Sequence, residues 1–145
     1  MIKIQVDSDP EITSPDENSA RSIIKTVLAD NQIKAGSISL IFGNDELLSA
    51  LKQKFFKLKQ FTDVIAFRLN DYKDKDPEGE LYISLPRAKE NARTFGEPFA
   101  REIARLLIHG TLHLLNYKDD TETDKKDMEK REEKYLNQVN WKELI

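Results

Sequence analysis

Residues 98–115 read PFAREIARLLIHGTLHLL, and this stretch lies at the centre of the fold that we expect. After Ile103 its apolar residues occupy most faces of a helix, so the pattern predicts a buried central helix over Pro98–Leu115. Its two histidines, His109 and His113, are the only ones in the chain. Positions i and i+4 lie on one helix face, about 6 Å apart between Cβ atoms. Both imidazole rings can therefore reach one divalent metal ion.

The residues after this helix supply a candidate third ligand. Asn116 readily adopts the left-handed conformation that ends a helix, so the chain can fold back and present Asp119, with Asp120 as the competing choice. Two histidines and a carboxylate that leave one position open are typical of a catalytic zinc site. Imidazole also suits nickel, copper and iron. The alternative is a pair of partly buried histidines that only form hydrogen bonds.

Strands and helices alternate outward from the central helix. Period-two patterns and β-rich runs predict four strands, at Lys3–Asp7, Ser37–Phe42, Asp63–Leu69 and Glu80–Leu85. Helix-start and helix-stop signals predict about five helices: one capped by Ser14 with Pro15 at its first position, one capped by Asn44, Pro86–Phe95 ended by Gly96, Pro98–Leu115, and one from the cap Thr121 to about Val139. We expect a single α/β (α+β) domain over residues 1–145 with one small mixed four-stranded sheet.

Composition narrows the class of protein. The 145 residues are 39% hydrophobic and 34% charged, which suits one modest core under a charged surface. The chain has no cysteine, so disulfides and thiolate metal sites are excluded. The N-terminus has no apolar run of a signal peptide and no segment is long enough to span a bilayer, so we expect a cytoplasmic protein without membrane contact. The net charge of −3 means that RNA binding needs a local basic patch.

One segment offers such a patch. Residues 51–61 read LKQKFFKLKQF and combine four lysines with three phenylalanines. Lys54, Lys57 and Lys59 are the candidate RNA-binding residues, with an aromatic ring available under a base. The alternative is a helix end whose phenylalanines belong to the core and whose lysines are solvated. The acidic and basic residues of 122–133 are expected on an exposed helix face. Thr62 and Asp63 are expected to be the residues that lead into a strand, in preference to neighbours of the metal site.

Gly110 limits the chemistry of the histidine pair. In H-E-x-x-H metallopeptidases the residue after the first histidine is the glutamate that acts as general base. Here it is a glycine, which costs about 1 kcal/mol in a helix relative to alanine. Its presence indicates close backbone packing or space for a substrate, and it disfavours a peptidase.

Three segments of the chain resemble a known family. Residues 109–119, HGTLHLLNYKD, resemble the signature H-G-x-L-H-L-x-G-Y-D-H of YbeY, the bacterial rRNA-maturation endoribonuclease. Thr62–Phe67 and Gly79–Ser84 resemble two of its strands, and the resemblance extends from about Asn44 to Leu136. It implies a mixed α/β fold, one zinc ion per chain, cleavage of single-stranded RNA, and roles in small-subunit rRNA 3′-end maturation and ribosome quality control.

Two departures from the family pattern concern function. The third ligand of the family is usually histidine, whereas this chain has Asp119, and a carboxylate can replace imidazole on zinc. A functional arginine of the family aligns with Phe56, which leaves Lys57 or Lys59 to supply positive charge, and lysine cannot copy a bidentate guanidinium contact.

The resemblance and the residues together predict a metal-dependent endoribonuclease that acts on single-stranded rRNA, with His109, His113 and Asp119 on the zinc ion. Its expected partners are rRNA and, beyond it, the small ribosomal subunit or assembly proteins. Two rival hypotheses remain: a ribosome-assembly binding protein that keeps the metal for structure, and a metal hydrolase of another substrate.

Overall fold

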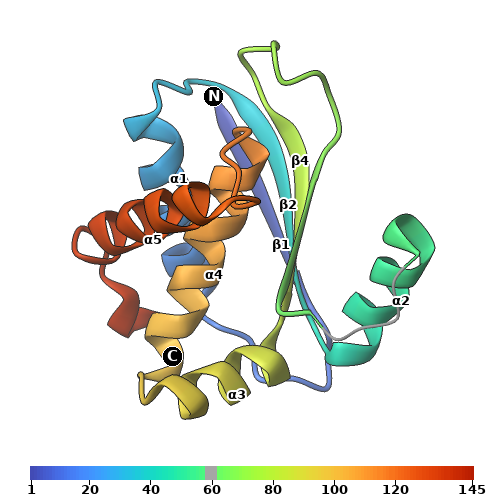
Figure 1. Cartoon of the computed structure of the whole chain (residues 1–145). Coiled ribbons are helices and arrows are strands. Elements are labelled where there is room, and N and C mark those ends of the chain that lie inside the picture. The colour runs from blue at the N-terminus through green and yellow to red at the C-terminus, as the bar shows by residue number, and fades with distance from the viewer. Residues whose placement is uncertain (58–61) are drawn as a thin grey trace.

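The fold is an α/β arrangement of one sheet and its helices, described by a computed structural model for residues 1–57 and 62–145 (Figure 1). The elements follow the order β1 (Ile2–Ser8), α1 (Glu17–Asp30), β2 (Gly36–Gly43), α2 (Asp45–Phe56), β3 (Val64–Arg68), β4 (Glu78–Ser84), α3 (Leu85–Phe95), α4 (Phe99–Leu114), α5 (Glu122–Leu136) and the short 3-10 helix η1 (Trp141–Leu144). The four strands and five α-helices expected from the sequence are confirmed within these residues.

The sheet is mixed, as expected. Its strand order is β1-β2-β4-β3, with β1, β2 and β4 parallel and β3 antiparallel to β4. Val6 pairs with Leu40, and Leu40 pairs with Leu81, so one row of buried side chains crosses three strands. Because side chains alternate between faces along a strand, this register directs the apolar residues of all three strands to one face.

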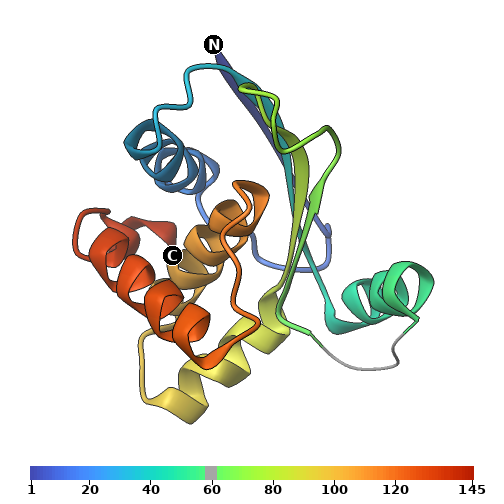
Figure 2. The same cartoon turned by 45° about the horizontal axis from the view of Figure 1, so that its top comes forward.

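The helices divide unequally between the two faces of the sheet. The helices α1, α3, α4 and α5 lie on the face that holds the apolar row, and α2 lies alone on the opposite face (Figures 1 and 2). The expected central helix is confirmed, because Ile103, Leu107 and Leu112 of α4 are fully buried. The side chain of Trp141 packs against the same core.

The start of α1 differs from the sequence expectation. We expected Ser14 as its cap, but the carboxylate of Asp16 caps the helix by accepting a 2.9 Å hydrogen bond from the Ser19 amide. The same carboxylate also accepts from the Ser19 hydroxyl, whereas the Ser14 hydroxyl bonds to that of Ser8. Aspartate caps helices as well as serine does, so the local signals did not separate the two positions. Pro15 therefore precedes the helix.

The other expected helix caps are confirmed, but α5 ends at Leu136 and not near Val139 as expected. The side chain of Asn44 caps α2 by accepting a hydrogen bond from the Leu47 amide. The side chain of Thr121 caps α5 by accepting one from the Asp124 amide. Gly96 ends α3 in the left-handed region, at φ 66°. In the described part of the chain no helix is long and apolar enough to cross a membrane.

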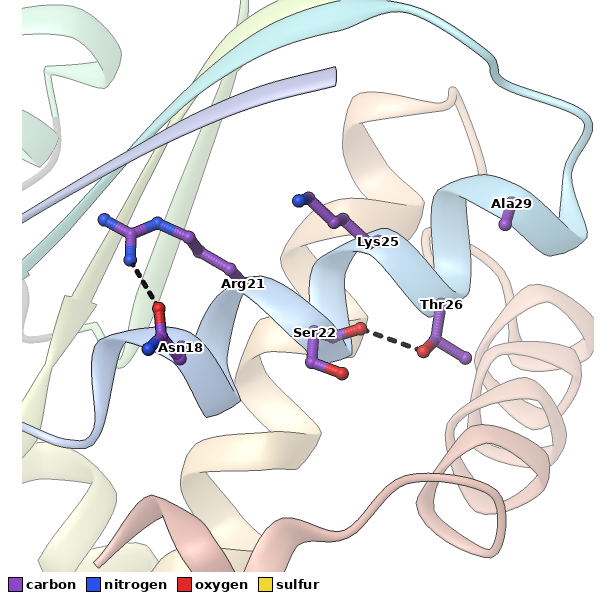
Figure 3. Close-up of a pocket in the computed structure, with 6 residues that line it drawn as sticks. All are labelled: Asn18, Arg21, Ser22, Lys25, Thr26 and Ala29. Carbon is purple, nitrogen blue, oxygen red and sulfur yellow. Dashed lines mark hydrogen bonds between the residues drawn. The ribbon is translucent and has the colours of Figure 1, made fainter. Parts of the chain in front are cut away.

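The outer strand β1 is protected by α1. Arg21 donates a 2.9 Å hydrogen bond to the carbonyl of Ile4, which would otherwise face solvent at the sheet edge. The same guanidinium binds the side chains of Asn18 and Glu17. An open groove of about 390 Å³ runs along this side of α1 (Figure 3), lined by Asn18, Arg21, Ser22, Lys25, Thr26 and Ala29. It includes none of the metal-ligand candidates.

Candidate metal centre

The two histidines lie side by side on α4. Their rings meet edge to face with centroids 4.5 Å apart, and the two Nε2 atoms are 2.9 Å apart. The side chain of His109 is 17% exposed and that of His113 is 30% exposed, so solvent reaches both. Burial, followed by the neighbouring His109, lowers the pKa of His113. The ring of His113 is therefore neutral near pH 7, which is the form that binds a metal ion.

The chain reverses after α4 and returns Asp119 to the histidines. Asn116 has φ 73°, and its amide and that of Tyr117 donate to carbonyls of the last turn of the helix. The expected left-handed turn is confirmed. One carboxylate oxygen of Asp119 then lies 3.4 Å from each histidine Nε2. Asp120 is exposed and is not part of this group.

The donor atoms of these three residues form a nearly equilateral triangle. Its sides are 2.9, 3.4 and 3.4 Å. A tetrahedral zinc ion with bonds of about 2.0–2.1 Å separates its ligand atoms by about 3.3 Å. Two imidazoles and one carboxylate also match the donor preference of zinc. The residues present therefore fit one metal ion, and three protein ligands would leave one position of a tetrahedral ion for water or substrate.

A buried acid that the sequence analysis missed orients the first histidine. Glu132 of α5 is 5% exposed, and its carboxylate lies 2.6 Å from Nδ1 of His109. A carboxylate accepts hydrogen bonds, so Nδ1 carries the proton and Nε2 keeps its lone pair for the metal. The charge pattern of residues 122–133 predicts an exposed helix face, and for Glu132 that prediction is wrong. The signal was its position four residues after Met128, on the apolar stripe of α5.

Glu132 belongs to a larger polar network behind the histidines. Arg105 donates two 2.8 Å hydrogen bonds to Glu102 and a 3.3 Å bond to Glu132. The amide of Asn91 bridges Glu102 and Asp63 at 3.0 Å each. Asp63 is thus a member of this network as well as a residue before β3.

The electrostatics of this region favour a cation. The carboxylates of Asp63, Glu102 and Glu132 face the guanidinium of Arg105, and the carboxylate of Asp119 lies beside the two histidines. The hydrogen bonds with Glu102 are the main cause that raises the pKa of Arg105. With Arg105 fully charged, this cluster still carries an excess of negative charge, which a divalent metal ion offsets.

Gly110 lies where α4 meets the sheet. A Cβ atom at this position would lie 2.8 Å from Cδ2 of Leu81 and 3.2 Å from Cγ2 of Val64. Of the two expected explanations for this glycine, close packing therefore applies. It also leaves no carboxylate at the position where a zinc peptidase carries its base.

The structure does not bring the candidate RNA-binding lysines to the metal ligands. Lys54 and Lys57 are exposed at the end of α2, on the opposite face of the sheet from α4 (Figure 1), and Lys59 lies outside the described residues. The alternative that the phenylalanines here are core residues is wrong for Phe55 and Phe56, which are 56% and 45% exposed.

Fold and site together define a class: a small mixed α/β protein whose buried helix presents a His-His-Asp group suited to one metal ion, as in metal-dependent hydrolases. A model of the family described as Endoribonuclease YbeY matches residues 3–140. The chain belongs to the YbeY family, which confirms the family expected from residues 109–119.

Individual relatives agree with this assignment. Endoribonuclease YbeY of Flavobacterium psychrophilum is 35% identical over 137 residues, which cover 94% of each chain. The protein of the same name from Chlorobaculum parvum is 35% identical over 124 residues, 86% of each chain. The solution structure of TM1509 from Thermotoga maritima is similar with a TM-score of 0.63 and 25% identity, covering 94% of this chain and 88% of that one.

Proposed function

We propose that this protein is a zinc-dependent endoribonuclease that cleaves single-stranded RNA during rRNA maturation, at the 3′ end of small-subunit rRNA. The observation that supports this proposal most directly is the His109-His113-Asp119 group in a chain of the YbeY family. Ribosome quality control, contact with the small subunit or its assembly proteins, and a cytoplasmic location are parts of the same proposal.

Each residue of the site would have its own role. His109, His113 and Asp119 hold the ion, and Glu132 keeps His109 in the tautomer that can bind it. When bound, zinc supplies Lewis-acid activation of water and of a phosphoryl oxygen. The neutral ring of His113 needs no deprotonation before binding at neutral pH.

The choice of RNA over peptide rests on what the helix lacks. Gly110 offers no general base at the position used by zinc peptidases, and its packing against Leu81 leaves no space for one. RNA carries a 2′-hydroxyl that is a possible internal nucleophile, so its cleavage demands less of the protein. Lys54, Lys57 and Lys59 would supply phosphate contacts, and binding should weaken as salt rises.

A second candidate function is favoured by one observation. Phe56 occupies the position of the functional arginine in the family pattern, and phenylalanine makes no ionic contact with phosphate. The protein would then be an RNA-binding assembly factor in which the metal ion has only a structural role. A hydrolase of a substrate other than RNA is the remaining alternative.

One set of measurements separates these functions. Elemental analysis should find near one zinc ion per chain in the wild type and little in the His109→Ala/His113→Ala double variant. The wild type should cleave single-stranded RNA slowly and lose this activity with a chelator, and Lys57→Gln/Lys59→Gln should reduce it. Casein should stay intact. RNA binding without chelator-sensitive cleavage would favour the assembly factor, and rapid peptide cleavage would refute the choice of substrate.

A further inference from the structure

Four aromatic side chains meet on the face of the sheet that carries α2. Phe67 of β3 is at their centre: the ring of Phe56 stacks on it at 5.9 Å with 15° between the planes, and Phe55 meets it edge to face at 5.2 Å. Tyr82 of β4 meets Phe67 edge to face, with ring centroids 5.9 Å apart. We call Phe55, Phe56, Phe67 and Tyr82 the aromatic platform.

The platform is open to solvent at its α2 end. Phe55 and Phe56 remain 56% and 45% exposed, and Leu48 is the buried residue of α2 within the described residues. The helix lies on the other face of the sheet from the four remaining helices (Figure 2), and it is tied to α3 at its first residue, where Asp45 pairs with Arg87 at 3.0 Å. Two adjacent exposed phenylalanines on a weakly packed helix mark an interaction surface, because contiguous apolar area left in water is unfavourable.

One lysine lies beside each of the two exposed phenylalanine rings. Nζ of Lys52 lies 4.8 Å from the ring centre of Phe56, and Nζ of Lys54 lies 5.3 Å from that of Phe55. Lys57 follows at the end of the helix. In residues 1–57 and 62–145, the ion pairs found do not include any of these three lysines. A chain with a net charge of −3 thus places unpaired positive charge beside exposed rings.

This combination suits one kind of partner. Aromatic faces stack with unpaired bases, and lysines beside them contact phosphates, which is how single-stranded nucleic acid is bound without sequence preference. A protein partner fits less well, because lysine is depleted in protein–protein interfaces. A duplex also fits less well, because its base faces are already stacked inside the helix.

We infer that the aromatic platform binds one or two bases of single-stranded RNA through Phe55 and Phe56, with Lys52 and Lys54 on the adjacent phosphates. The inference rests on the proposed function and adds its substrate-binding surface. The strand β3 is the outermost strand on this side of the sheet. Val64 lies close to Gly110 of α4, whereas Phe67 of the same strand belongs to the platform on the other face. RNA that passes around the β3 edge therefore reaches both the platform and the metal ligands.

The experiment measures binding separately from cleavage. A fluorescein-labelled oligoadenylate and an abasic oligonucleotide of equal length are titrated with the full chain in excess chelator, and anisotropy is read. Phe55→Ala/Phe56→Ala should lose at least about fivefold in affinity for oligoadenylate, since stacking contributes about 1–3 kcal/mol per base. Its affinity for the abasic strand should change less than about twofold, because the lysines remain. Phe55→Leu/Phe56→Leu should lose as much affinity for oligoadenylate as the alanine pair, because leucine is apolar but has no planar ring to stack on a base.

The matched control is Phe95→Ala, which removes another exposed ring, 61% accessible at the end of α3. It should bind both oligonucleotides like the wild type. Equal loss on both strands, unchanged binding, or a wild-type dimer that the alanine pair dissociates would each overturn the inference. Failure of the proposed function gives a different result: the wild type would bind RNA in this assay yet show no chelator-sensitive cleavage.

Discussion

Nδ1 of His109 lies 2.6 Å from the carboxylate of Glu132, which joins α4 to α5 directly behind the candidate metal ligands. The opposite nitrogen of the same ring lies 3.4 Å from Asp119. One buried acid therefore determines which nitrogen of His109 faces the ligand group. Such outer carboxylates fix both the tautomer and the orientation of metal-binding histidines.

Replacing Glu132 should weaken zinc binding. Glu132→Ala frees His109 to rotate and to change tautomer, so we expect zinc affinity to fall by about 10- to 100-fold. Glu132→Gln retains an oxygen acceptor and should lose less. Competition with a chromophoric chelator measures the affinity. The neighbouring Glu133→Gln removes an exposed partner of Arg101 and should leave zinc affinity unchanged. Equal affinities for the Glu132 and Glu133 variants would contradict this role.

Asp119, and not Asp120, should be the third ligand. Asp119→Ala removes an oxygen 3.4 Å from both histidine nitrogens, so zinc affinity should fall by more than the roughly 10- to 100-fold expected for loss of an outer partner. Asp120→Ala should have a small effect, and Asp119→His should keep or tighten binding. Isothermal titration with zinc compares the three variants. A larger loss in Asp120→Ala would refute the assignment.

Adding even one methyl group at Gly110 should destabilise the protein. Alanine favours a helix by about 1 kcal/mol, but overpacking a core costs about 1–3 kcal/mol, so Gly110→Ala should lose up to about 2 kcal/mol of unfolding free energy. The added Cβ would approach Leu81 and Val64, and Leu81 is fully buried. Urea unfolding measures the change. Leu81→Val should cost less in the Gly110→Ala background than alone, and a Gly110→Ala variant more stable than the wild type would disprove the close contact.

Tyr135 and Asp30 should make stability depend on pH. The hydroxyl of Tyr135 donates to the Asp30 carboxylate and is the main cause that lowers the pKa of Asp30 below 3.8; Lys134 is the second cause. Because the folded pKa is depressed, the bond stabilises the protein above the pKa of the unfolded chain. That stabilisation is lost as pH falls through the folded pKa.

We therefore expect Tyr135→Phe to reduce unfolding free energy near neutral pH, and we expect this difference from the wild type to shrink as pH falls through the folded pKa of Asp30. NMR titration of the Asp30 carboxyl carbon should show its pKa move upward in the variant. In alkali the wild type should lose stability between the ordinary tyrosine pKa of 10 and the folded pKa of Tyr135, about 12. An unchanged Asp30 pKa would exclude this coupling.

Local patterns predicted most of the elements. Strand alternation and helix caps located every strand and α-helix of the described residues, and the errors fell at helix ends: two good caps compete at Ser14 and Asp16, and α5 stops at Leu136 before the expected Val139. Cap and period signals depend on neighbouring residues, so they can be recognised in a single sequence. The strand order β1-β2-β4-β3 and the position of α2 on the face opposite the other helices could not be recognised in this way.

The histidine pair and its carboxylate could be predicted because their relation is local. Helix geometry places His113 one turn from His109, and a left-handed Asn116 returns the chain within a few residues to Asp119. Glu132 is 23 residues from His109. Its charge suggested a solvated helix face, and only the packing of α5 against α4 turns it inward.

The sequence by itself therefore determined the three candidate ligands, since short-range backbone geometry brings them together. Tertiary structure alone decided which nitrogen of His109 faces the ligand group and which face of the sheet carries Phe56. Both depend on contacts between elements far apart in the chain. Such contacts form when buried area and satisfied polar groups offset the loss of chain entropy, a balance that belongs to the whole fold and not to any one segment.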